Sequence, residues 1–215
     1  LFAQFIQHMH TVFSMKELGT VSYFLGISVQ ALSHGYFLSQ TKYATELLHK
    51  AGLTDCKPCS TPLAVKASYS PSSSSDELPF SNPSLYRSIV GGLQYLTITS
   101  PDLALAVNQA CQHMHLPTNA DFQAVKRLLR YVKGTLHHSL HFTSGPLSLH
   151  AFSDSNWARD SVDHKSTSGY CVYLGSNLIS WSAKKQPIVS RSSTEAEYRA
   201  LANATAELTR LQQFL

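Results

Sequence analysis

The chain has 215 residues, of which 43% are hydrophobic and 14% are charged, so it is long and apolar enough to form one large domain or two smaller ones. The formal net charge of +4 is compatible with an anionic partner but does not require one. No apolar run reaches the roughly 20 residues that cross a bilayer, and the first residues lack the pattern of a signal peptide. From these features we expect neither a membrane-spanning segment nor a signal peptide within these residues. The chain does not begin with Met and its last residues continue a helical pattern, so we expect a fragment of a longer protein.

The first third of the chain predicts a helix, a β-hairpin and a second helix. Apolar side chains recur at helical spacing in residues 1–14. A turn around Gly19 precedes a strand, and GYFLSQ is the expected partner of that strand in a hairpin. Thr41 begins the next helix, which Gly52 ends as the glycine after the last helical residue.

The cysteine pair Cys56 and Cys59 in CKPC has the spacing of a zinc knuckle or a redox pair. A zinc site would need a second Cys or His pair at suitable spacing, and the sequence has none. A redox pair would lie at a helix N-terminus, but the following STPLAV does not begin a helix. We interpret CKPC as reduced and structural, with a thiol or zinc module as the minor alternative. The lack of a disulfide framework favours an intracellular protein.

Residues 67–82 are rich in Ser and Pro and predict a flexible linker. Three helices follow it, and the last of them ends at Gly134. The predicted apolar face of this last helix consists of Phe122, Val125, Leu128, Leu129 and Val132. Each helix has a start signal, namely Asn82 before Pro83, Ser100 before Pro101, and Thr118 three residues before Asp121.

The third of these helices carries basic side chains on one face. Lys126, Arg130 and Lys133 recur at i, i+4 and i+7, with Arg127 beside them. Such a stripe is a solvated surface on most helices, and it is also the pattern that contacts nucleic-acid phosphates. The pattern alone leaves both interpretations open.

From residue 147 the hydrophobic period changes to that of strands. SLHAFSDSNW, SGYCVYLG and NLISWSAKK predict three strands, and RSSTEAEYRAL begins a final helix. A three-stranded sheet with one helix is thin for independent stability. The predicted buried stripe of the helix consists of Leu201, Ala204, Leu208, Leu211 and Leu215.

Two carboxylates in this last region are candidate metal ligands. Asp154 ends the first strand and Glu197 lies in the first turn of the helix. Two close carboxylates repel each other unless a cation lies between them, and oxygen ligands favour Mg²⁺. Two such ions about 4 Å apart would activate a water and stabilise the leaving oxygen of a phosphodiester.

Each acidic residue also has a simpler interpretation. Glu197 lies three residues after Thr194, and Glu195 lies three residues after Ser192, so each pair could be a capping box. Asp154 could end its strand in a turn. The residue pattern alone therefore leaves a structural and a metal-binding role open for these residues.

The order of the motifs along nearly the whole chain adds a specific resemblance. The motifs are FSMKELGTVSYFLGISV, GYFLSQTKYATELLHKAG, CKPCSTPL, LYRSIVGGLQYL, DFQAVKRLLRYVKGTLHHSLHF, AFSDSNWA, STSGYCVYLGSNLISWSAKKQPIVSRSSTEAEYRAL and ANATAEL. Together they resemble the Ty1/copia class of LTR-retrotransposon Pol polyproteins. The resemblance implies an α+β chain of several parts. These are the end of the reverse transcriptase palm with its hairpin (1–66), the linker (67–82), a helical thumb or connection (83–145) and the β-β-β-α first half of a ribonuclease H-like domain (146–215).

The same resemblance implies functions for individual residues. Asp154 and Glu197 match the ribonuclease H aspartate on the first strand and glutamate on the first helix, which would make them catalytic and metal ligands. Glu195 would remain a helix-start acid. The intact parent would copy RNA into DNA and cleave the RNA of RNA–DNA hybrids with two Mg²⁺ ions, whereas this fragment alone is expected to bind Mg²⁺ weakly or not at all. The implied nucleic-acid-binding residues are Lys126, Arg127, Arg130, Lys133, Lys184 and Lys185.

The resemblance also implies partners and a location. The partners would be an RNA–DNA hybrid or duplex and the rest of the Pol polyprotein, with no membrane, and the location would be cytoplasmic. Departures from the family pattern predict that this chain alone is inactive. The polymerase YxDD aspartates and the last two ribonuclease H acids are not among these residues, and five positions differ from the family pattern, namely Ser28, Ser100, Asn156, Arg159 and Arg210. The alternative is a non-catalytic nucleic-acid-binding remnant, and a relic reading frame without a selected role also stays open.

Overall fold

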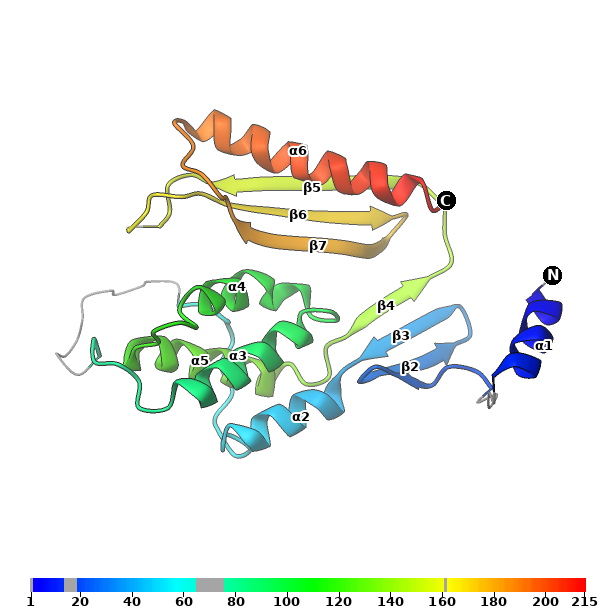
Figure 1. Cartoon of the computed structure of the whole chain (residues 1–215), viewed down its shortest axis with the longest axis horizontal. Helices are drawn as coiled ribbons and strands as arrows, with labels where there is room; N and C mark the ends of the chain where they lie inside the picture. Colours follow the sequence, from blue (N-terminus) through cyan, green and yellow to red (C-terminus); the bar gives the residue numbers. More distant parts are fainter. Residues whose placement is uncertain (1, 14–18, 65–75, 161) are drawn as a thin grey trace.

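A computed structural model describes residues 2–13, 19–64, 76–160 and 162–215, which form two regions and an N-terminal helix (Figure 1). The helix is α1 (Phe2–Val12). The first region contains β1 (Tyr23–Phe24), β2 (Ile27–Leu32), β3 (Gly35–Ser39), α2 (Thr41–Lys50), α3 (Pro83–Leu96), η1 (Pro101–Leu103), α4 (Ala104–Gln112), α5 (Asn119–Gly134) and β4 (Leu140–Thr143). The second region contains β5 (Leu149–Asn156), β6 (Thr167–Leu174), β7 (Asn177–Lys185) and α6 (Ser193–Gln212). The chain is an α+β protein with two antiparallel sheets, as the sequence predicts. No helix among the described residues is long and apolar enough to cross a membrane.

The predicted hairpin is confirmed, and it belongs to a larger sheet. β2 pairs with β3, and β4 adds to the other edge of β3, so that the strand order is β1-β2-β3-β4. Gly35 permits this pairing, because a Cβ atom there would lie 1.8 Å from the carbonyl oxygen of Phe142. The sequence did not predict β4. Through β4, the segments 1–66 and 83–145 share one sheet.

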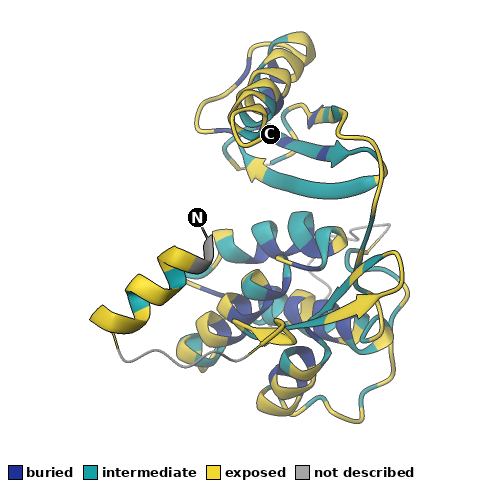
Figure 2. Ribbon diagram, turned by 90° about the vertical axis from the view of Figure 1, so that its right-hand side faces the viewer, coloured by how far each residue is buried: buried dark blue, intermediate teal, exposed yellow. Residues whose placement is uncertain are grey.

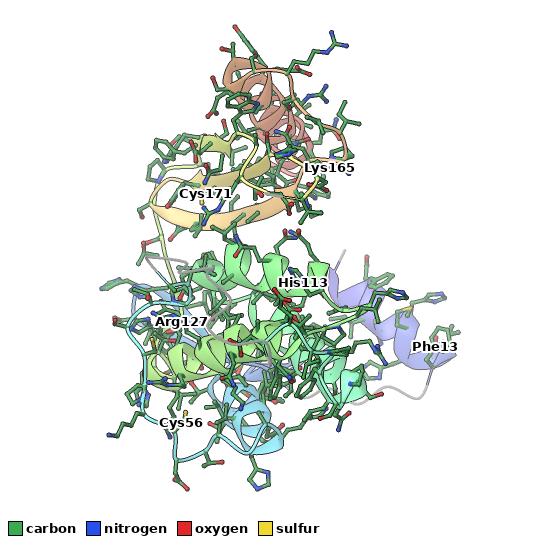
Figure 3. All side chains as sticks on the ribbon, turned by 90° about the vertical axis from the view of Figure 1, so that its left-hand side faces the viewer. Phe13, Cys56, His113, Arg127, Lys165 and Cys171 are labelled. Carbon is green, nitrogen blue, oxygen red and sulfur yellow. The ribbon has the colours of Figure 1, made fainter. Side chains whose placement is uncertain are left out.

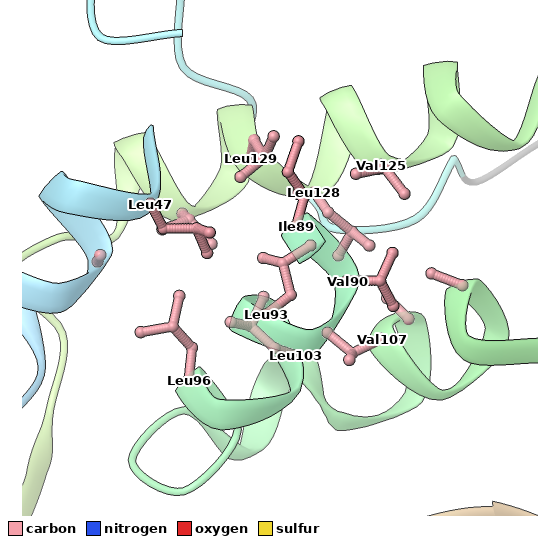
Figure 4. Packing of buried hydrophobic residues seen from close by; sticks show 14 of the residues in the cluster. Leu47, Ile89, Val90, Leu93, Leu96, Leu103, Val107, Val125, Leu128 and Leu129 are labelled. Carbon is pink, nitrogen blue, oxygen red and sulfur yellow. The ribbon is translucent and has the colours of Figure 1, made fainter. Parts of the chain in front are cut away.

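The same two segments also share one hydrophobic core, which lies between α2, α3, α4 and α5 (Figure 4). Figure 2 shows the buried residues gathered among these helices. The predicted apolar face of α5 is confirmed, since Val125, Leu128, Leu129 and Val132 are all buried. The largest fully buried side chains come from α2, α3, η1, α4 and α5 and include Leu48, Tyr86, Ile89, Leu93, Leu103 and Leu128.

The predicted linker is described only at its end. Residues 67–75 of the linker lie outside the described residues. Beyond them, the Phe80 N–H donates to the carbonyl of Pro117 (2.8 Å), and its ring stacks on Phe122 with 4.1 Å between centroids. Pro79 forms a β-bridge with Thr118. The last residues of the predicted linker therefore pack against the start of α5.

The helix starts follow the predicted caps in two of three cases. The Asn82 side chain accepts a hydrogen bond from Leu85 N, and Thr118 with Asp121 forms a reciprocal capping box. Ser100 is different, because its side chain makes no capping bond. Pro101–Leu103 forms a 3₁₀ turn in which the Leu103 N–H bonds the Ser100 carbonyl before α4 begins. The backbone carbonyl of Ser100 thus takes the place of the predicted side-chain cap.

The second region is an antiparallel sheet of order β5-β6-β7 with α6 packed against β5 and β6 (Figure 1). All three predicted strands are confirmed. The predicted buried stripe of α6 is wrong at both ends, because Leu201 is 52% exposed and Leu215 is 63% exposed. The buried positions are Ala196, Ala200 and Ala204. These small side chains recur every four residues, so they let the helix lie against the sheet and turn Leu201 toward solvent.

Candidate functional site

A hydrogen bond brings the two predicted catalytic residues into neighbouring positions. The Ser155 N–H at the end of β5 donates to Glu197 Oε1 in the first turn of α6, at 3.2 Å. Ser155 directly follows Asp154 in the strand. The fold therefore places the helix glutamate beside the strand residue that follows the predicted catalytic aspartate.

The side chains of Asp154 and Glu197 nevertheless line different hollows. The Ser155 hydroxyl accepts from Gln186 Nε2, which also donates to the α6 carbonyl of Ala196, so Ser155 faces the helix. Successive side chains of a strand point to opposite faces, so Asp154 faces the other way. Asp154 lines a cavity of about 370 Å³ between the sheet and the segment formed by η1 and α4. Glu197 borders a separate hollow beside α6.

The donor chemistry of this pair fits a magnesium ion. Asp154 and Glu197 both carry carboxylates, both are exposed, and Mg²⁺ is commonly held by one or two carboxylates together with waters. Among the described residues, no group of three or more His, Cys, Asp or Glu side chains is placed to hold a metal ion. Each carboxylate is thus of a chemical type that suits Mg²⁺, but the two side chains line separate hollows and do not form a set of ligands in this structure.

The neighbouring Glu195 is a helix-start acid, as predicted. Its Oε2 accepts from the Arg191 N–H at 2.8 Å, and its Oε1 pairs with Arg199 at 2.8 Å. The hydrogen bond from Arg199 and the backbone bond from Arg191 lower the pKa of Glu195. The N-cap is Ser192, whose hydroxyl accepts from Glu195 N. The capping box suggested for Thr194 and Glu197 does not form, because Thr194 already lies inside the helix.

The predicted basic face of α5 is divided by contacts with the CKPC segment. Arg127 Nη2 donates to Thr61 Oγ1 at 2.7 Å, and Arg130 Nε donates to the carbonyl of Lys57 at 2.8 Å. Figure 3 shows Arg127 on the same side of the molecule as Cys56. The Lys126 ammonium lies 5.0 Å from the centroid of the Phe122 ring. Two of the four predicted phosphate-binding side chains are thus held by the protein itself.

The segment that contains CKPC is joined to α5 by hydrogen bonds in this structure. All four cysteines are free, and the Cys59 N–H donates to the Arg130 carbonyl at 3.1 Å. The Cys59 thiol lies 3.5 Å from the carbonyl oxygen of Thr61. A hydrogen bond from the backbone of Thr61 lowers the pKa of Cys59, and the charges of Arg127 and Arg130 lower it further against the opposing effect of desolvation. The sequence did not predict these hydrogen bonds, because they join residues about 70 positions apart along the chain.

The two lysines at the end of β7 differ in their surroundings. Lys185 Nζ lies 2.6 Å from Asp160 Oδ2 and 2.9 Å from Asp163 Oδ1. Partial burial opposes the charged form of Lys185, but the hydrogen bonds to both aspartates outweigh it and raise its pKa. The same Lys185 bond holds the pKa of Asp160 far below its usual range. Lys184 is exposed, so it is the better placed of the two for an external anion.

Comparison with known proteins assigns the family. Residues 1–65 match the family described as reverse transcriptase (RNA-dependent DNA polymerase). The chain is 55% identical over 95% of its length to an uncharacterized mitochondrial protein of Arabidopsis thaliana, of which it covers 84%. It is 49% identical over 91% of its length to the retrovirus-related Pol polyprotein from transposon RE2 of Arabidopsis thaliana. This chain belongs to the Ty1/copia family of Pol polyproteins.

The similarity to another copia-type polyprotein also extends over nearly the whole chain. The chain is 34% identical over 94% of its length to the Pol polyprotein from transposon TNT 1-94 of Nicotiana tabacum. It covers only 13% of the RE2 polyprotein and 16% of the TNT 1-94 polyprotein. No solved structure matches the chain. The reverse transcriptase match ends in the segment after CKPC, so the region that holds Asp154 and Glu197 lies outside it.

Proposed function

We propose that this copia-type chain is a part of a reverse transcriptase and ribonuclease H that contacts the RNA–DNA duplex and contributes two ribonuclease H carboxylates. In this proposal residues 1–66 end the polymerase palm, 83–145 form the thumb or connection, and 146–215 begin the ribonuclease H-like domain. One observation is the main support for this proposal. The hydrogen bond between Ser155 N and Glu197 Oε1 joins the helix-start glutamate to the strand residue that directly follows Asp154.

The proposed roles follow from where the side chains lie. Asp154 and Glu197 would be the oxygen ligands that this chain gives to Mg²⁺, and the ion would supply water activation when bound. Lys126, Lys133 and Lys184 would contact phosphate groups, whereas Arg127, Arg130 and Lys185 are held by internal hydrogen bonds. This division of the basic residues narrows the proposed duplex-binding surface to Lys126, Lys133 and Lys184.

We further propose that the chain alone does not cleave, because two carboxylates that line separate hollows make an incomplete site. The test is to incubate purified 1–215 with a labelled RNA–DNA hybrid and Mg²⁺. The expected result is an intact RNA strand. Mg²⁺-dependent cleavage that disappears in Asp154→Asn would overturn the proposed inactivity and would establish catalysis by this chain.

The second candidate function is duplex binding without any chemistry. It is favoured by the exposed Lys184 and by the net charge of +4. Contacts with phosphates release counterions, so affinity should fall steeply as salt rises. Titration of a labelled hybrid at two salt concentrations measures this. Binding that does not respond to salt, or no binding at either concentration, would contradict it.

A further inference from the structure

The side chain of Gln186 lies at a junction that neither proposed function uses. It follows directly after β7 and is only 4% exposed. Its Nε2 atom lies within hydrogen-bond distance of Ser168 Oγ (2.8 Å), the Ala196 carbonyl (3.0 Å) and Ser155 Oγ (3.3 Å). Its Oε1 accepts from the Ser190 hydroxyl at 2.6 Å. The amide is therefore satisfied on both its donor and its acceptor side.

Two of these contacts are made to residues that are adjacent in the chain to the predicted carboxylate residues. Ser155 is the residue after Asp154, and Ala196 is the residue before Glu197. The two hydrogens of Nε2 are thus shared among three acceptors, which lie in β6, in the first turn of α6 and, at the longest distance, at the end of β5. The Gln186 N–H also donates to the Ser166 carbonyl at 2.8 Å, which fixes the backbone that carries the amide.

The hydrogen-exchange rate of the Ser155 N–H shows whether the first turn of α6 stays packed against the end of β5. β5 is the edge strand of its sheet, and alternate N–H groups of an edge strand point away from the ladder. The Ser155 N–H donates to Glu197 Oε1 instead. Its protection from hydrogen exchange therefore depends on where α6 holds Glu197.

We propose that Gln186 is a positioning residue, whose buried amide fixes the first turn of α6 against the end of β5 and so keeps the Glu197 carboxylate bonded to the N–H of Ser155, the residue after Asp154. This role rests on the proposed function, in which the two carboxylates act together. A purely structural amide would stabilise the whole sheet alike. An amide that positions Glu197 would instead affect mainly the hydrogen bond between the Ser155 N–H and Glu197.

Hydrogen exchange measured by NMR on the full chain separates these two roles. In Gln186→Leu, we expect the Ser155 amide to exchange about tenfold faster, as on loss of one ordinary hydrogen bond, and to approach its rate in Glu197→Ala. The matched control is Gln40→Leu. Gln40 is also 4% exposed, but its Oε1 accepts from the Thr99 hydroxyl in the first region. The control should leave Ser155 exchange unchanged.

Two results would overturn the proposal. One is an unchanged Ser155 exchange rate in Gln186→Leu, and the other is an equal acceleration of all β5 amides. If Gln186→Leu does not fold, Ser190→Ala decides, because it removes only the hydroxyl that orients the amide. A smaller but selective acceleration at Ser155 is expected there. A rate equal to that of the unmodified chain would count against the positioning role.

Line broadening by Mn²⁺, used as a paramagnetic stand-in for Mg²⁺, tests the link to the proposed function separately. We expect the amides of Asp154 and Glu197 to broaden in the unmodified chain and to broaden less in Gln186→Leu. Equal broadening in both would refute the consequence of positioning for metal binding. An unmodified chain without any broadening would refute the proposed metal ligands, while the Ser155 exchange rates would still decide the position of Glu197.

Discussion

The two regions of the molecule are held together by different kinds of interior. The first region has a continuous hydrophobic core, to which α2, α3, η1, α4 and α5 each contribute fully buried side chains. The interior of the second region is small and polar. Its buried apolar residues are Val172, Ala196, Ala200 and Ala204, and the buried polar ones are Ser155, Ser166, Ser168, Gln186 and Ser190.

The two kinds of interior have different physical effects, one mainly on stability and the other mainly on the position of side chains. A hydrophobic core is non-directional and stabilises roughly in proportion to the apolar area that it buries. A satisfied polar network adds less net free energy, but each of its hydrogen bonds has a fixed direction. The candidate carboxylates lie beside the polar network, where direction matters more than bulk burial.

The largest expected effect is on the core of the first region. Leu93→Ala removes a fully buried side chain between the helices and should lower the free energy of unfolding by about 2–5 kcal/mol. Val172→Ala, in the smaller interior of the second region, should cost less because it removes less apolar volume. Urea denaturation of both variants measures the difference. A larger loss for Val172→Ala would contradict the comparison of the two interiors.

The next effect is on duplex binding by the first region. Changing Lys126 and Lys133 together to Ala should lower the salt dependence of hybrid binding by about two counterions, since each lysine contacts one phosphate in our proposal. The matched control is the double change of Arg127 and Arg130 to Ala, whose internal bonds leave them less free for phosphates. Salt titrations that show the greater loss for the arginine variant would reverse our assignment.

A smaller effect concerns the two capped helices. Thr118→Ala should cost about 1 kcal/mol of unfolding free energy, because it breaks the capping box at the start of α5. Ser192→Ala removes the cap of α6 and should cost about the same, since both hydroxyls accept one backbone N–H. Thermal unfolding monitored by circular dichroism compares them. Two unchanged midpoints would show that neither cap contributes.

The smallest effect is the acid sensitivity of the second region. Hydrogen bonds from Arg210 and from Ser180 lower the pKa of Glu207 to about 2. A depressed carboxyl pKa stabilises the fold above the pKa of the unfolded chain, and this contribution is lost as pH falls through the folded value. We expect the loss between about pH 4.5 and pH 2. Glu207→Gln should flatten the pH dependence of the unfolding midpoint in that window, and an identical profile would contradict the prediction.

The parts of the fold that the sequence predicted depend on neighbouring residues along the chain. The hairpin of β2 and β3, the strands β5 to β7, and the caps at Asn82 and Thr118 follow from turn residues, alternation and capping spacing. The apolar face of α5 was also correct, because five well-spaced apolar positions define a single face. The predicted buried stripe of α6 was correct at Ala204 but wrong at Leu201 and Leu215, because Ala196 and Ala200 take the buried positions at the start of the helix.

The candidate site shows the same division between local and distant information. The sequence singled out Asp154 and Glu197 as residue types at a strand end and a helix start. It did not predict that Glu197 would bond the Ser155 N–H, or that the two side chains would line separate hollows. It also missed Gln186, since a single glutamine after a strand carries no spacing signal of its own.

By itself, the sequence determined most of the elements, their order and the resemblance to the family, because periodicity, caps and motifs are properties of short segments. Only the tertiary structure decided the contacts between distant segments. β4 joins the N-terminal sheet, residues 57–61 accept hydrogen bonds from two arginines of α5, and the amide of Gln186 contacts both β5 and α6. Directional hydrogen bonds between residues far apart in the chain depend on how whole elements pack. The spacing of Asp154 and Glu197 is therefore set by the packing of α6 on its sheet.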